Sequence, residues 1–385
     1  MAQKNESIYL DFNATTPVDP RVFESMKDWF LTPSNAGSRT HQYGKSAKEA
    51  IEIAREHVAK VLGAKPEEIH FTSGATESNN IAILGLAALG ERTGRKHIVS
   101  TAIEHKAVLE PLEEMRRRGF EVDLAPVTRG GFVEVSTIEN LLRPDTLLVS
   151  VMHANNETGI LQPILEIAEL VSETDTFFHT DAAQTFGKEI AELRQAKCDF
   201  ISISGHKIFG PQGIGALFVR RVAGKKRPLE PIVFGGGQER GLRAGTIPVP
   251  LAVGLGEAAR LSIKENEDRA EAAKKNRKAI LEAITSIEHE MNGDQTRCQP
   301  HVINVRFPGV DSEALMMALK DKLAISNGSA CTASSYDPSH VLVAMGVDKD
   351  EALESVRLSW SLREISDSVV NVSIEAKKIG SMFTI

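Results

Sequence analysis

Short apolar runs alternate with longer stretches of helical periodicity along most of this chain. The runs typical of buried strands are residues 69–72, 97–100, 122–126, 147–152, 177–181, 200–203 and 214–219. Between them, apolar positions at helical spacing predict helices at 47–62, 75–89, 107–118, 135–142 and 164–172. Alternation at this spacing predicts an α/β fold with a parallel or mostly parallel sheet and helices on both faces.

The C-terminal part repeats the alternation on a smaller scale. A mostly helical, highly charged stretch from residue 253 to about 287 predicts a connection to a second, smaller α/β unit. Its expected elements are strands at 301–307 and 355–359, helices at 312–322 and 339–346, and a loop at 325–335. We therefore expect one large sheet domain followed by a small domain.

Composition excludes several classes of protein. The 385 residues carry a net charge of −7, which argues against a nucleic-acid surface because such a surface needs a basic face. No apolar run has the length of a signal peptide or a membrane span, so we expect a cytoplasmic protein without a membrane segment. The three cysteines form no Cys-x-x-Cys pair and the eleven histidines no His-Glu-x-x-His pattern, so neither a disulfide framework nor a bound metal is expected.

The first candidate for chemistry is Lys207, which lies in a turn between two apolar strands. Burial there disfavours the ammonium cation and favours a nucleophilic amine, the form that a Schiff base requires. The alternative is a lysine at a hairpin tip that points into water.

A second strand, residues 177–181, ends in Asp181. Functional groups of α/β sheets gather at the carboxyl ends of the strands, so Asp181 and Lys207 are expected to lie near each other. An imine-forming amine and a carboxylate for a pyridinium nitrogen are what pyridoxal 5'-phosphate (PLP) requires. Asp181 alone would equally suit a helix N-cap.

Three further stretches carry candidate groups. Residues 73–76 join a strand to a helix through small residues, which makes either an anion site or a plain N-cap. Cys331 lies among small and polar residues before Pro338, where a thiol is expected to be accessible and nucleophilic, whereas Cys198 and Cys298 lack such surroundings. Arg357 interrupts an apolar strand and needs an anion to justify burial, unless the strand is at an edge.

Several long motifs occur together in one order, at residues 9–17, 71–78, 151–159, 199–215 and 328–331. On these motifs the chain resembles the PLP-dependent cysteine desulfurases of the NifS/IscS type, in the class V aminotransferase family of fold type I. The resemblance covers nearly the whole chain. It implies that the N-terminal segment packs with the small domain, giving a large domain at 18–260 and a small domain from 1–17 and 261–385.

The resemblance also implies roles for individual residues. Lys207 would hold PLP, Asp181 its ring nitrogen and Gln184 its phenolic oxygen, while His105 would lie against the ring and move protons. The PLP phosphate would be bound by Ala75, Thr76, Ser204, His206 and, from a neighbouring subunit of a homodimer, Thr246. Asn156 would donate a hydrogen bond to substrate or cofactor.

The substrate groups follow from the same resemblance. Arg357 would bind the carboxylate of L-cysteine, and Cys331 would take the sulfur as a persulfide for an acceptor protein. Residues 359–362, Ser-Trp-Ser-Leu, depart from the family pattern beside Arg357.

The expected activity is therefore a cysteine desulfurase that releases L-alanine. An aminotransferase or selenocysteine lyase of the same fold, a non-enzymatic sulfur-relay protein, and a nucleotide-binding protein built on the glycine-rich residues 234–246 are the alternatives. The destination of the sulfur stays open among iron–sulfur cluster assembly, transfer-RNA thiolation and DNA sulfur modification.

Overall fold

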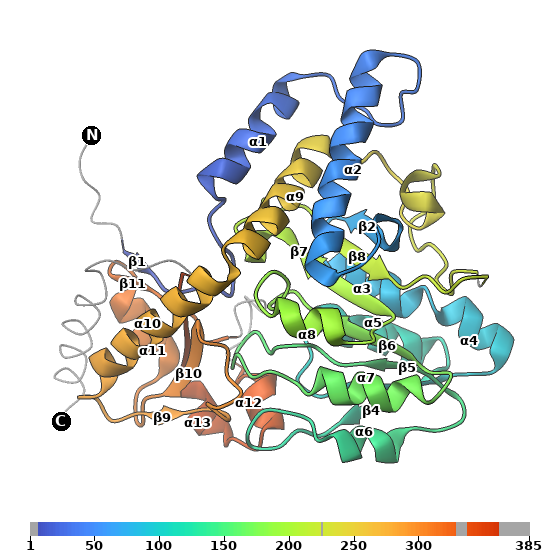
Figure 1. The fold of residues 1–385 in the computed structure, drawn as a ribbon. Helices are drawn as coiled ribbons and strands as arrows, with labels where there is room; N and C mark the ends of the chain where they lie inside the picture. Colours follow the sequence, from blue (N-terminus) through green and yellow to red (C-terminus); the bar gives the residue numbers. More distant parts are fainter. Residues whose placement is uncertain (1–6, 225, 329–336, 362–385) are drawn as a thin grey trace.

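The structure is a computed structural model that describes residues 7–224, 226–328 and 337–361 (Figure 1). Its centre is a seven-stranded sheet in the order β2-β8-β7-β6-β5-β3-β4. The strands are β2 (Ile69–Thr72), β3 (His97–Thr101), β4 (Glu121–Ala125), β5 (Thr146–Ser150), β6 (Phe177–Asp181), β7 (Phe200–Ser204) and β8 (Gly215–Val219). All seven apolar runs thus form strands of one sheet.

Six of the seven strands point in the same direction, and β8 alone is reversed. β4, β3, β5, β6 and β7 pair in parallel, whereas β8 is antiparallel to both of its neighbours, β7 and β2. The predicted α/β fold with a mostly parallel sheet is confirmed. The antiparallel β8 follows from the short connection after β7, because parallel strands need a longer crossover.

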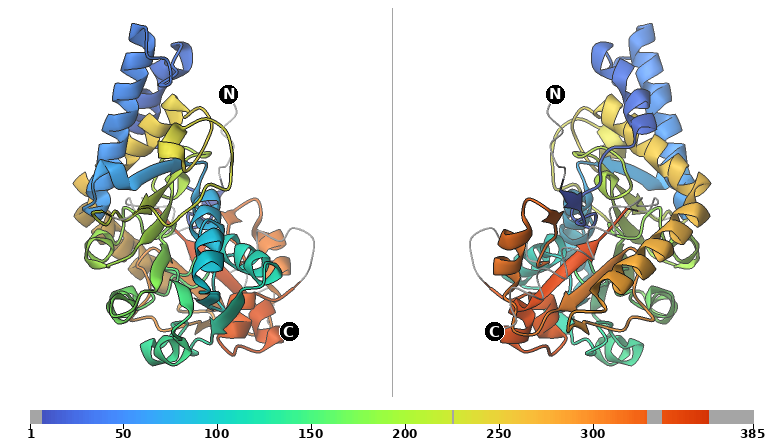
Figure 2. Two further views of the ribbon diagram at one scale, coloured as in Figure 1. Left: turned by 90° about the vertical axis from the view of Figure 1, so that its right-hand side faces the viewer. Right: turned by 90° about the vertical axis from the view of Figure 1, so that its left-hand side faces the viewer.

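Helices cover both faces of the sheet (Figure 2). Neighbouring residues of β3, Ile98 and Val99, are both fully buried but belong to separate hydrophobic clusters, as expected for a strand buried on two sides. One cluster is completed by α3 (Ala75–Leu84), α4 (Ala87–Thr93) and α5 (Lys106–Arg117). The other is completed by α1 (Pro20–Leu31), α2 (Gln42–Leu62), α6 (Val135–Leu141), α7 (Ile164–Ser172), α8 (Ile190–Gln195) and α9 (Val249–Lys264).

The single helix predicted for residues 75–89 is wrong, because α3 ends at Leu84 and α4 begins at Ala87. The backbone carbonyl of Gly85 accepts a hydrogen bond from Glu230 N, at 2.9 Å, and so leaves the helical ladder. A contact with a residue so distant in sequence leaves no trace in the local periodicity.

The C-terminal elements form a second assembly beside the large sheet. α10 (Asn266–Ile284) leads away from α9 to two small sheets (Figure 1). One has the order β12-β10-β9, from β12 (Ser355–Ser359), β10 (Val302–Arg306) and β9 (Glu290–Met291), and the other pairs β1 (Ile8–Tyr9) in parallel with β11 (Leu323–Ala324). Three helices accompany these strands: α11 (Ser312–Leu319), α12 (His340–Ala344) and α13 (Lys349–Leu353). The exact domain boundaries stay a prediction.

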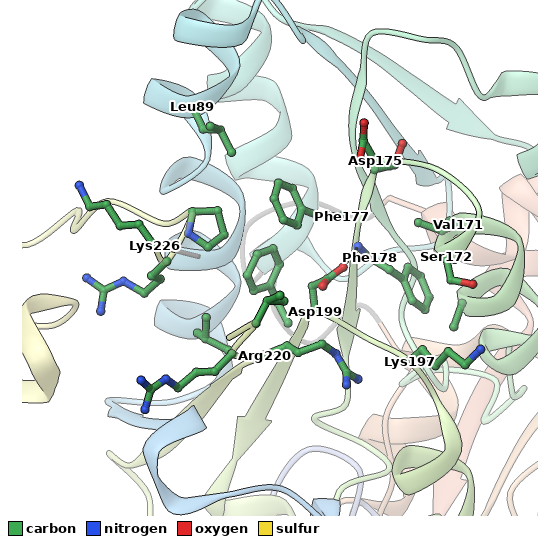
Figure 3. A pocket seen from close by; sticks show the side chains of 18 of the residues that line it. Leu89, Val171, Ser172, Asp175, Phe177, Phe178, Lys197, Asp199, Arg220 and Lys226 are labelled. Carbon is green, nitrogen blue, oxygen red and sulfur yellow. Dashed lines mark hydrogen bonds between the residues drawn. The ribbon is translucent and has the colours of Figure 1, made fainter. Parts of the chain in front are cut away.

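A cleft of about 790 Å³ opens at the amino-terminal edge of the parallel strands (Figure 3). Phe177 and Phe200, the first residues of β6 and β7, line it together with Asp199 and Arg220. None of the residues predicted for the site lines this cleft. The predicted chemistry therefore belongs to the opposite edge of the sheet. Within the described ranges, no helix combines the length and apolarity needed to cross a membrane.

Candidate active site

Lys207 ends a short 3-10 turn, Gly205–Lys207, that follows β7 directly. Its side chain is half-buried, and Nζ donates hydrogen bonds to the backbone carbonyls of Asn13 and, at 2.8 Å, Ala14. The amine is therefore directed at the N-terminal segment of the chain. The alternative of a hairpin-tip lysine pointing into water is wrong.

The backbone after Lys207 is fixed by the N-terminal segment. The Thr16 hydroxyl donates to His206 O, at 2.9 Å, and accepts from Phe209 N, at 2.8 Å. Asp19 N donates to Phe209 O at 3.0 Å. Phe209 has a φ of 65°, a left-handed conformation that costs energy for a residue with a Cβ and persists only where its surroundings impose it.

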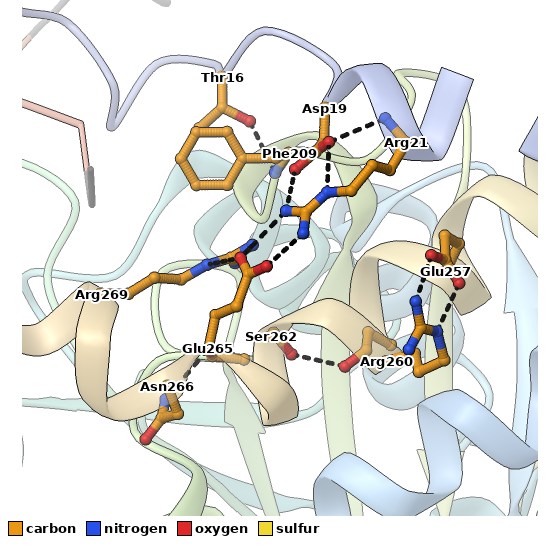
Figure 4. A network of polar contacts seen from close by, with 12 residues as sticks. Thr16, Asp19, Arg21, Phe209, Glu257, Arg260, Ser262, Glu265, Asn266 and Arg269 are labelled. Carbon is orange, nitrogen blue, oxygen red and sulfur yellow. Dashed lines mark hydrogen bonds and ion pairs between the residues drawn. The ribbon is translucent and has the colours of Figure 1, made fainter. Parts of the chain in front are cut away.

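An ion-pair network supports this contact from outside (Figure 4). Arg21 on α1 binds Asp19 at 2.8 Å and also pairs with Glu265, which joins α9 to α10. Glu265 accepts a further bond from Arg269 at 2.9 Å, and the Arg269 guanidinium lies 5.2 Å from the centre of the Phe209 ring. The strained turn after Lys207 is thus packed against α1 and α10.

Asp181 is the last residue of β6, and its backbone pairs with Ser202 of β7. Its carboxylate is only 6% exposed and accepts two hydrogen bonds, from Ala183 N at 2.9 Å and from Asn79 Nδ2 at 2.7 Å. Asn79 is fully buried on α3. Sequence reasoning missed Asn79, although a polar residue at a core position of an apolar helix is a signal that could have found it.

His105 begins α5 as its N-cap, and its Nδ1 accepts from Ala107 N at 3.1 Å. Burial lowers the pKa of His105, the carboxylate of Asp181 opposes this, and the charge of Lys207 adds to it. All three predicted side chains therefore act on one another electrostatically. Because the imidazole is uncharged near neutral pH, it can both accept and donate a proton.

Glu104 lies beside His105 and is fully buried. Burial raises the pKa of Glu104 to about 8. Its Oε1 accepts from the Thr101 hydroxyl at 2.9 Å and from Met152 N at 2.8 Å. Near neutral pH this side chain is therefore a neutral carboxylic acid for most of the time.

The start of α3 and Ser204, both predicted to bind phosphate, lie where β2 and β7 end and β8 begins. α3 starts at Ala75 and Thr76 without a side-chain cap, so the first N–H groups of this helix are not bonded by a capping side chain. A Cβ on Gly215 would lie 2.6 Å from Gly74 Cα, and Gly215 pairs with Ser204. This close glycine contact brings the start of α3 beside Ser204.

His206 and Thr246 are placed differently. His206 Nδ1 lies 3.0 Å from the Thr15 hydroxyl, and burial lowers the pKa of His206 to about 4, so the ring is neutral near pH 7. Thr246 is exposed, in a segment fixed by Gly245 N donating to Gln238 at 3.0 Å. Within one chain, therefore, Thr246 is free to face a second copy.

Asn13 connects the predicted residues. Its backbone carbonyl accepts from Lys207 Nζ and, at 3.0 Å, from Gln184 Nε2. The side-chain amide of Asn13 donates to the backbone carbonyl of Asn156 at 3.2 Å. This Asn156 carbonyl also accepts from Arg357 Nη1, at 2.9 Å. The residues predicted separately around Lys207 and around Arg357 are thereby brought together. Asn13 was not among the predicted site residues.

Arg357 lies on β12 and is 3% exposed. The anion that its burial demands is Asp11, whose Oδ1 accepts from Arg357 Nη2 at 2.6 Å. Asp11 belongs to the N-terminal segment and was also missed from the sequence. The alternative of an exposed arginine on an edge strand is wrong, because the side chain of Arg357 is buried and paired with Asp11.

The thiols divide as follows. Cys331 lies outside the described residues. Cys198 is buried and Cys298 half-buried, and burial raises the pKa of both thiols. Because a thiolate is the reactive form, neither is suited to nucleophilic attack near neutral pH.

Some of the buried polar atoms that have no hydrogen-bond partner among the described residues belong to residues of this site or next to it. They include Asn13 Oδ1, Gln184 Oε1, Arg357 Nε and Glu104 Oε2. Such atoms are rare in folded proteins and call for a bound partner. The arrangement therefore suits a polar ligand held between Lys207 and Arg357.

Comparisons with known proteins agree with this geometry. The family model for aminotransferase class-V matches residues 8–371. The cysteine desulfurase IscS of Vibrio cholerae is 45% identical over 377 residues, covering 97% of this chain and 92% of the relative. A solved NifS-like protein superposes with a TM-score of 0.90 at 36% identity, covering 98% of this chain and all of that chain. A structure titled SspA in complex with cysteine has a TM-score of 0.82 at 38% identity, with 93% of this chain and all of that chain covered. The chain belongs to the class-V aminotransferase family and, within it, to the cysteine desulfurases of the NifS/IscS type.

Proposed function

We propose that this protein uses PLP to convert L-cysteine to L-alanine and transfers the sulfur to Cys331. The observation that carries the proposal is the chain of contacts from Lys207 through Asn13 and Asn156 to Arg357. It places an amine and a guanidinium at the two ends of one small site, as an amino-acid substrate requires. The desulfurase relatives and the neighbour named for its cysteine complex support the choice of substrate.

The residues present fit PLP. Lys207 would hold its aldehyde carbon, Asp181 its ring nitrogen and Gln184 its phenolic oxygen, with His105 against the ring. The phosphate would be bound by Ala75, Thr76, Ser204 and His206, with Thr246 from a second subunit. When bound, PLP supplies an electron sink for negative charge at the substrate α-carbon.

Asp181 would supply a fixed negative charge to the ring nitrogen of PLP. Its carboxylate would keep that nitrogen protonated, and the amide of Asn79 fixes the carboxylate plane through its 2.7 Å hydrogen bond. A buried carboxylate that is already oriented needs no reorganisation during the reaction. This is why two donors converge on Asp181.

Lys207 and Arg357 act on the substrate itself. Lys207 Nζ takes the proton from the α-carbon of cysteine, and the two carbonyls that it contacts define where the amine rests beforehand. Arg357 binds the substrate carboxylate, with Asp11 and Asn156 O fixing the guanidinium plane. Substrate is thereby held at its carboxylate while its α-proton faces the lysine.

Cys331 completes the reaction by taking the sulfur. Its thiolate attacks the sulfur atom of cysteine, an S–S bond forms, and the C–S bond breaks with its electron pair passing to carbon. Protonation of that carbon and return of a proton to the α-carbon give alanine, and the sulfur remains on Cys331 as a persulfide. An acceptor protein then removes it.

The same proposal includes a homodimer. Large apolar side chains are exposed on α1, on α2 and beside the glycine-rich segment: Phe23, Phe30, Leu31, Tyr43, Ile53, Val233 and Phe234. A partner subunit would bury such groups and bring Thr246 to the neighbouring phosphate site. Sedimentation of dilute protein tests this, and a fully active monomer would remove Thr246 from the site.

We further propose that the protein works in the cytoplasm and delivers sulfur to an acceptor protein, for iron–sulfur cluster assembly or for thiolation of transfer RNA or DNA. Capturing bound proteins and asking which of them takes labelled sulfur from the persulfide distinguishes these destinations.

The test of the central proposal is Cys331→Ser. A serine hydroxyl stays protonated and does not attack sulfur, so alanine formation from cysteine should fall by at least about a hundredfold. The variant should still bind cysteine and change its absorption spectrum. Wild-type protein given labelled cysteine should carry sulfur on the Cys331 peptide. Label on Cys198 or Cys298, or normal turnover by the variant, would instead favour an aminotransferase or lyase.

A further inference from the structure

Glu157 is a buried carboxyl group that the reaction described above does not use. It follows Asn156 in the turn after β5 and is only 3% exposed. Its backbone N–H donates to Asn155 Oδ1 at 2.9 Å, and its carbonyl accepts from Asn304 on β10 at 3.3 Å. The backbone of Glu157 is therefore held by hydrogen bonds at its N–H and at its carbonyl, and this orients the side chain.

Two residues from the small assembly meet this carboxyl group at the same oxygen. The Ser339 hydroxyl donates to Glu157 Oε2, and Ser339 is the N-cap of α12. On the other side, a Cβ on Gly328 would stand 2.5 Å from Oε2, and Gly328 has a φ of 86°. Only glycine fits at this position, because both the backbone conformation and the approach of Oε2 exclude a side chain.

Gly328 and Ser339 stand on either side of residues 329–336, which lie outside the described residues and contain Cys331. One carboxyl group thus contacts the chain shortly before and shortly after the proposed nucleophile. We infer that Glu157 is a positioning residue for the proposed reaction: it fixes Gly328 and Ser339, the described residues before and after the Cys331 segment, relative to each other. The inference rests on the proposed transfer of sulfur to Cys331.

The location of Glu157 explains why such a contact matters for the reaction. The carbonyl of the preceding residue, Asn156, accepts from Arg357 at 2.9 Å. Asn156 therefore binds the arginine that would hold the substrate, and the next residue, Glu157, contacts the residues that flank the Cys331 segment. Their adjacency in one turn therefore relates Arg357 to the residues on either side of that segment, and a change in it would alter how often thiol and substrate meet.

The neighbouring contacts fix each end of the segment separately. On the near side, Ser326 exchanges two backbone hydrogen bonds with Arg357, at 2.6 and 3.3 Å. On the far side, the ring of His340 lies 3.0 Å from Glu104 O. The carboxyl group of Glu157 contacts both Gly328 and Ser339. Without it, each of these residues keeps its neighbouring contacts, but no single group connects the two.

Burial raises the pKa of Glu157, and the Ser339 hydroxyl and the charges of His340 and Arg357 oppose this. Among the described residues, no cation lies within ion-pair distance of its carboxylate. A hydrogen-bond acceptor of this shape is therefore what the contact requires, and glutamine can supply it. This provides a conservative control.

The experiment measures how fast iodoacetamide alkylates Cys331 in the intact holoenzyme, with the product mapped by mass spectrometry. Glu157→Ala should change that rate by at least about fivefold and lower sulfur transfer to Cys331 about tenfold, while KM for cysteine stays within about twofold. Glu157→Gln keeps the acceptor for Ser339 and should stay within about threefold of wild type. Cys298 is the internal control, because a general loosening would change its alkylation rate too.

If Glu157→Ala does not fold, Ser339→Ala tests the other partner of the same contact. This change also removes an N-cap, so Asp348→Ala, which removes the N-cap of the adjacent α13, is the matched control. Ser339→Ala should alter Cys331 alkylation at least about fivefold more than Asp348→Ala. Equal rates in the two variants would refute the inference.

Gly328→Ala provides an independent test through a double-mutant cycle. The added methyl meets Glu157 Oε2, so its effect on Cys331 alkylation should shrink when Glu157 is also alanine. Gly346→Ala, at a φ of 79° with no atom within 4 Å of the added carbon, controls for backbone strain. Additive effects of the two changes would overturn the inference.

The labelling experiment separates failure of this inference from failure of the proposed function. Wild-type protein without label on Cys331 would refute the proposed function itself. Labelled wild type with unaffected variants would refute only the role of Glu157.

Discussion

The two halves of the site are built in different ways. Around Lys207 and Asp181, the functional groups stand at ends of neighbouring strands, and the backbone of one sheet sets their positions. Around Arg357 and Glu157, buried charged side chains meet partners from remote segments, 346 residues away for Asp11 and 182 for Ser339. We call these the sheet half and the contact half. In the sheet half, the backbone should keep its shape when one side chain is removed. In the contact half, the position of each group depends on its paired side chain.

The largest effect is expected in the sheet half, from Lys207→Ala. The variant should fold, because Lys207 is half-buried and its contacts include hydrogen bonds to two backbone carbonyls that can be lost without opening the core. It should form no imine with PLP at the site. The absorption spectrum, with and without borohydride, measures this.

Lys188 is the matched control for that change. It is a second lysine near the site, with Nζ 3.1 Å from His301 Nε2, and burial lowers the pKa of Lys188 to about 7. Lys188→Ala should keep the reducible imine. A chromophore that survives in the Lys207 variant and disappears in the Lys188 variant would transfer the assignment to Lys188.

Asp181→Asn should have the next largest effect, a loss of about a hundredfold in kcat with PLP still bound, because an amide cannot stabilise a protonated ring nitrogen. Steady-state kinetics of the PLP-saturated variant measure it. Undiminished turnover would refute the role.

Asn79→Ala sharpens the same comparison. It leaves the carboxylate of Asp181 in place and removes only the 2.7 Å hydrogen bond that orients it. A loss of about tenfold is expected, the scale of one hydrogen bond to a charged group. A loss as large as that of Asp181→Asn would mean that the sheet half also depends on single contacts.

In the contact half, Arg357→Lys should lower kcat/KM for cysteine by about tenfold or more, mainly through KM. Lysine keeps the positive charge but cannot bind Asp11, Asn156 O and a substrate carboxylate through one planar fork. Kinetics at several cysteine concentrations separate KM from kcat. An unchanged KM would show that another group binds the carboxylate.

The last prediction concerns stability and pH rather than turnover, at Glu104. The folded protein holds the proton of Glu104 up to a pKa of about 8, whereas the unfolded chain releases it near the ordinary value of 4.5. Between these values the folded state binds more protons, so the free energy of unfolding decreases as pH rises, by up to about 1.4 kcal/mol per pH unit.

Glu104→Gln removes this dependence while keeping an oxygen that accepts from Thr101 and Met152 N. Urea unfolding midpoints of variant and wild type should therefore converge near the acid end of this range and separate toward pH 8, with the variant more stable. Parallel curves would show that Glu104 is already ionised in the folded protein.

The sheet half was largely predictable from the sequence and the contact half was not. Strand periodicity located β6 and β7, and the topology of α/β sheets then placed Asp181 and Lys207 at one edge. Arg357 was recognised as an arginine that needs an anion, yet the identity of that anion, Asp11, depends on how two segments at opposite ends of the chain pack. Periodicity carries no information about such pairs.

The same limit applies to Asn79 and Glu157. Asn79 stands among other polar residues of α3, one of which, Ser78, is equally buried, and Glu157 stands in a turn where Asn and Gly alone would explain the motif. Both became visible only through their partners, Asp181 and Ser339. The break between α3 and α4 at Gly85 was missed for the same reason.

The position of Asn13 has a consequence for synthesis of the protein on the ribosome. Asn13 emerges before every strand of the large sheet, but its backbone N–H is bound by Ser359 Oγ, at 2.9 Å, and the adjoining β1 pairs with β11. The large sheet can fold during translation, since its strands are complete by Val219. The segment around Asn13 can reach its final position only after β12 has been synthesised. Until then Lys207 lacks its contacts with Asn13 and Ala14, so the site is completed in one late docking step of this N-terminal segment.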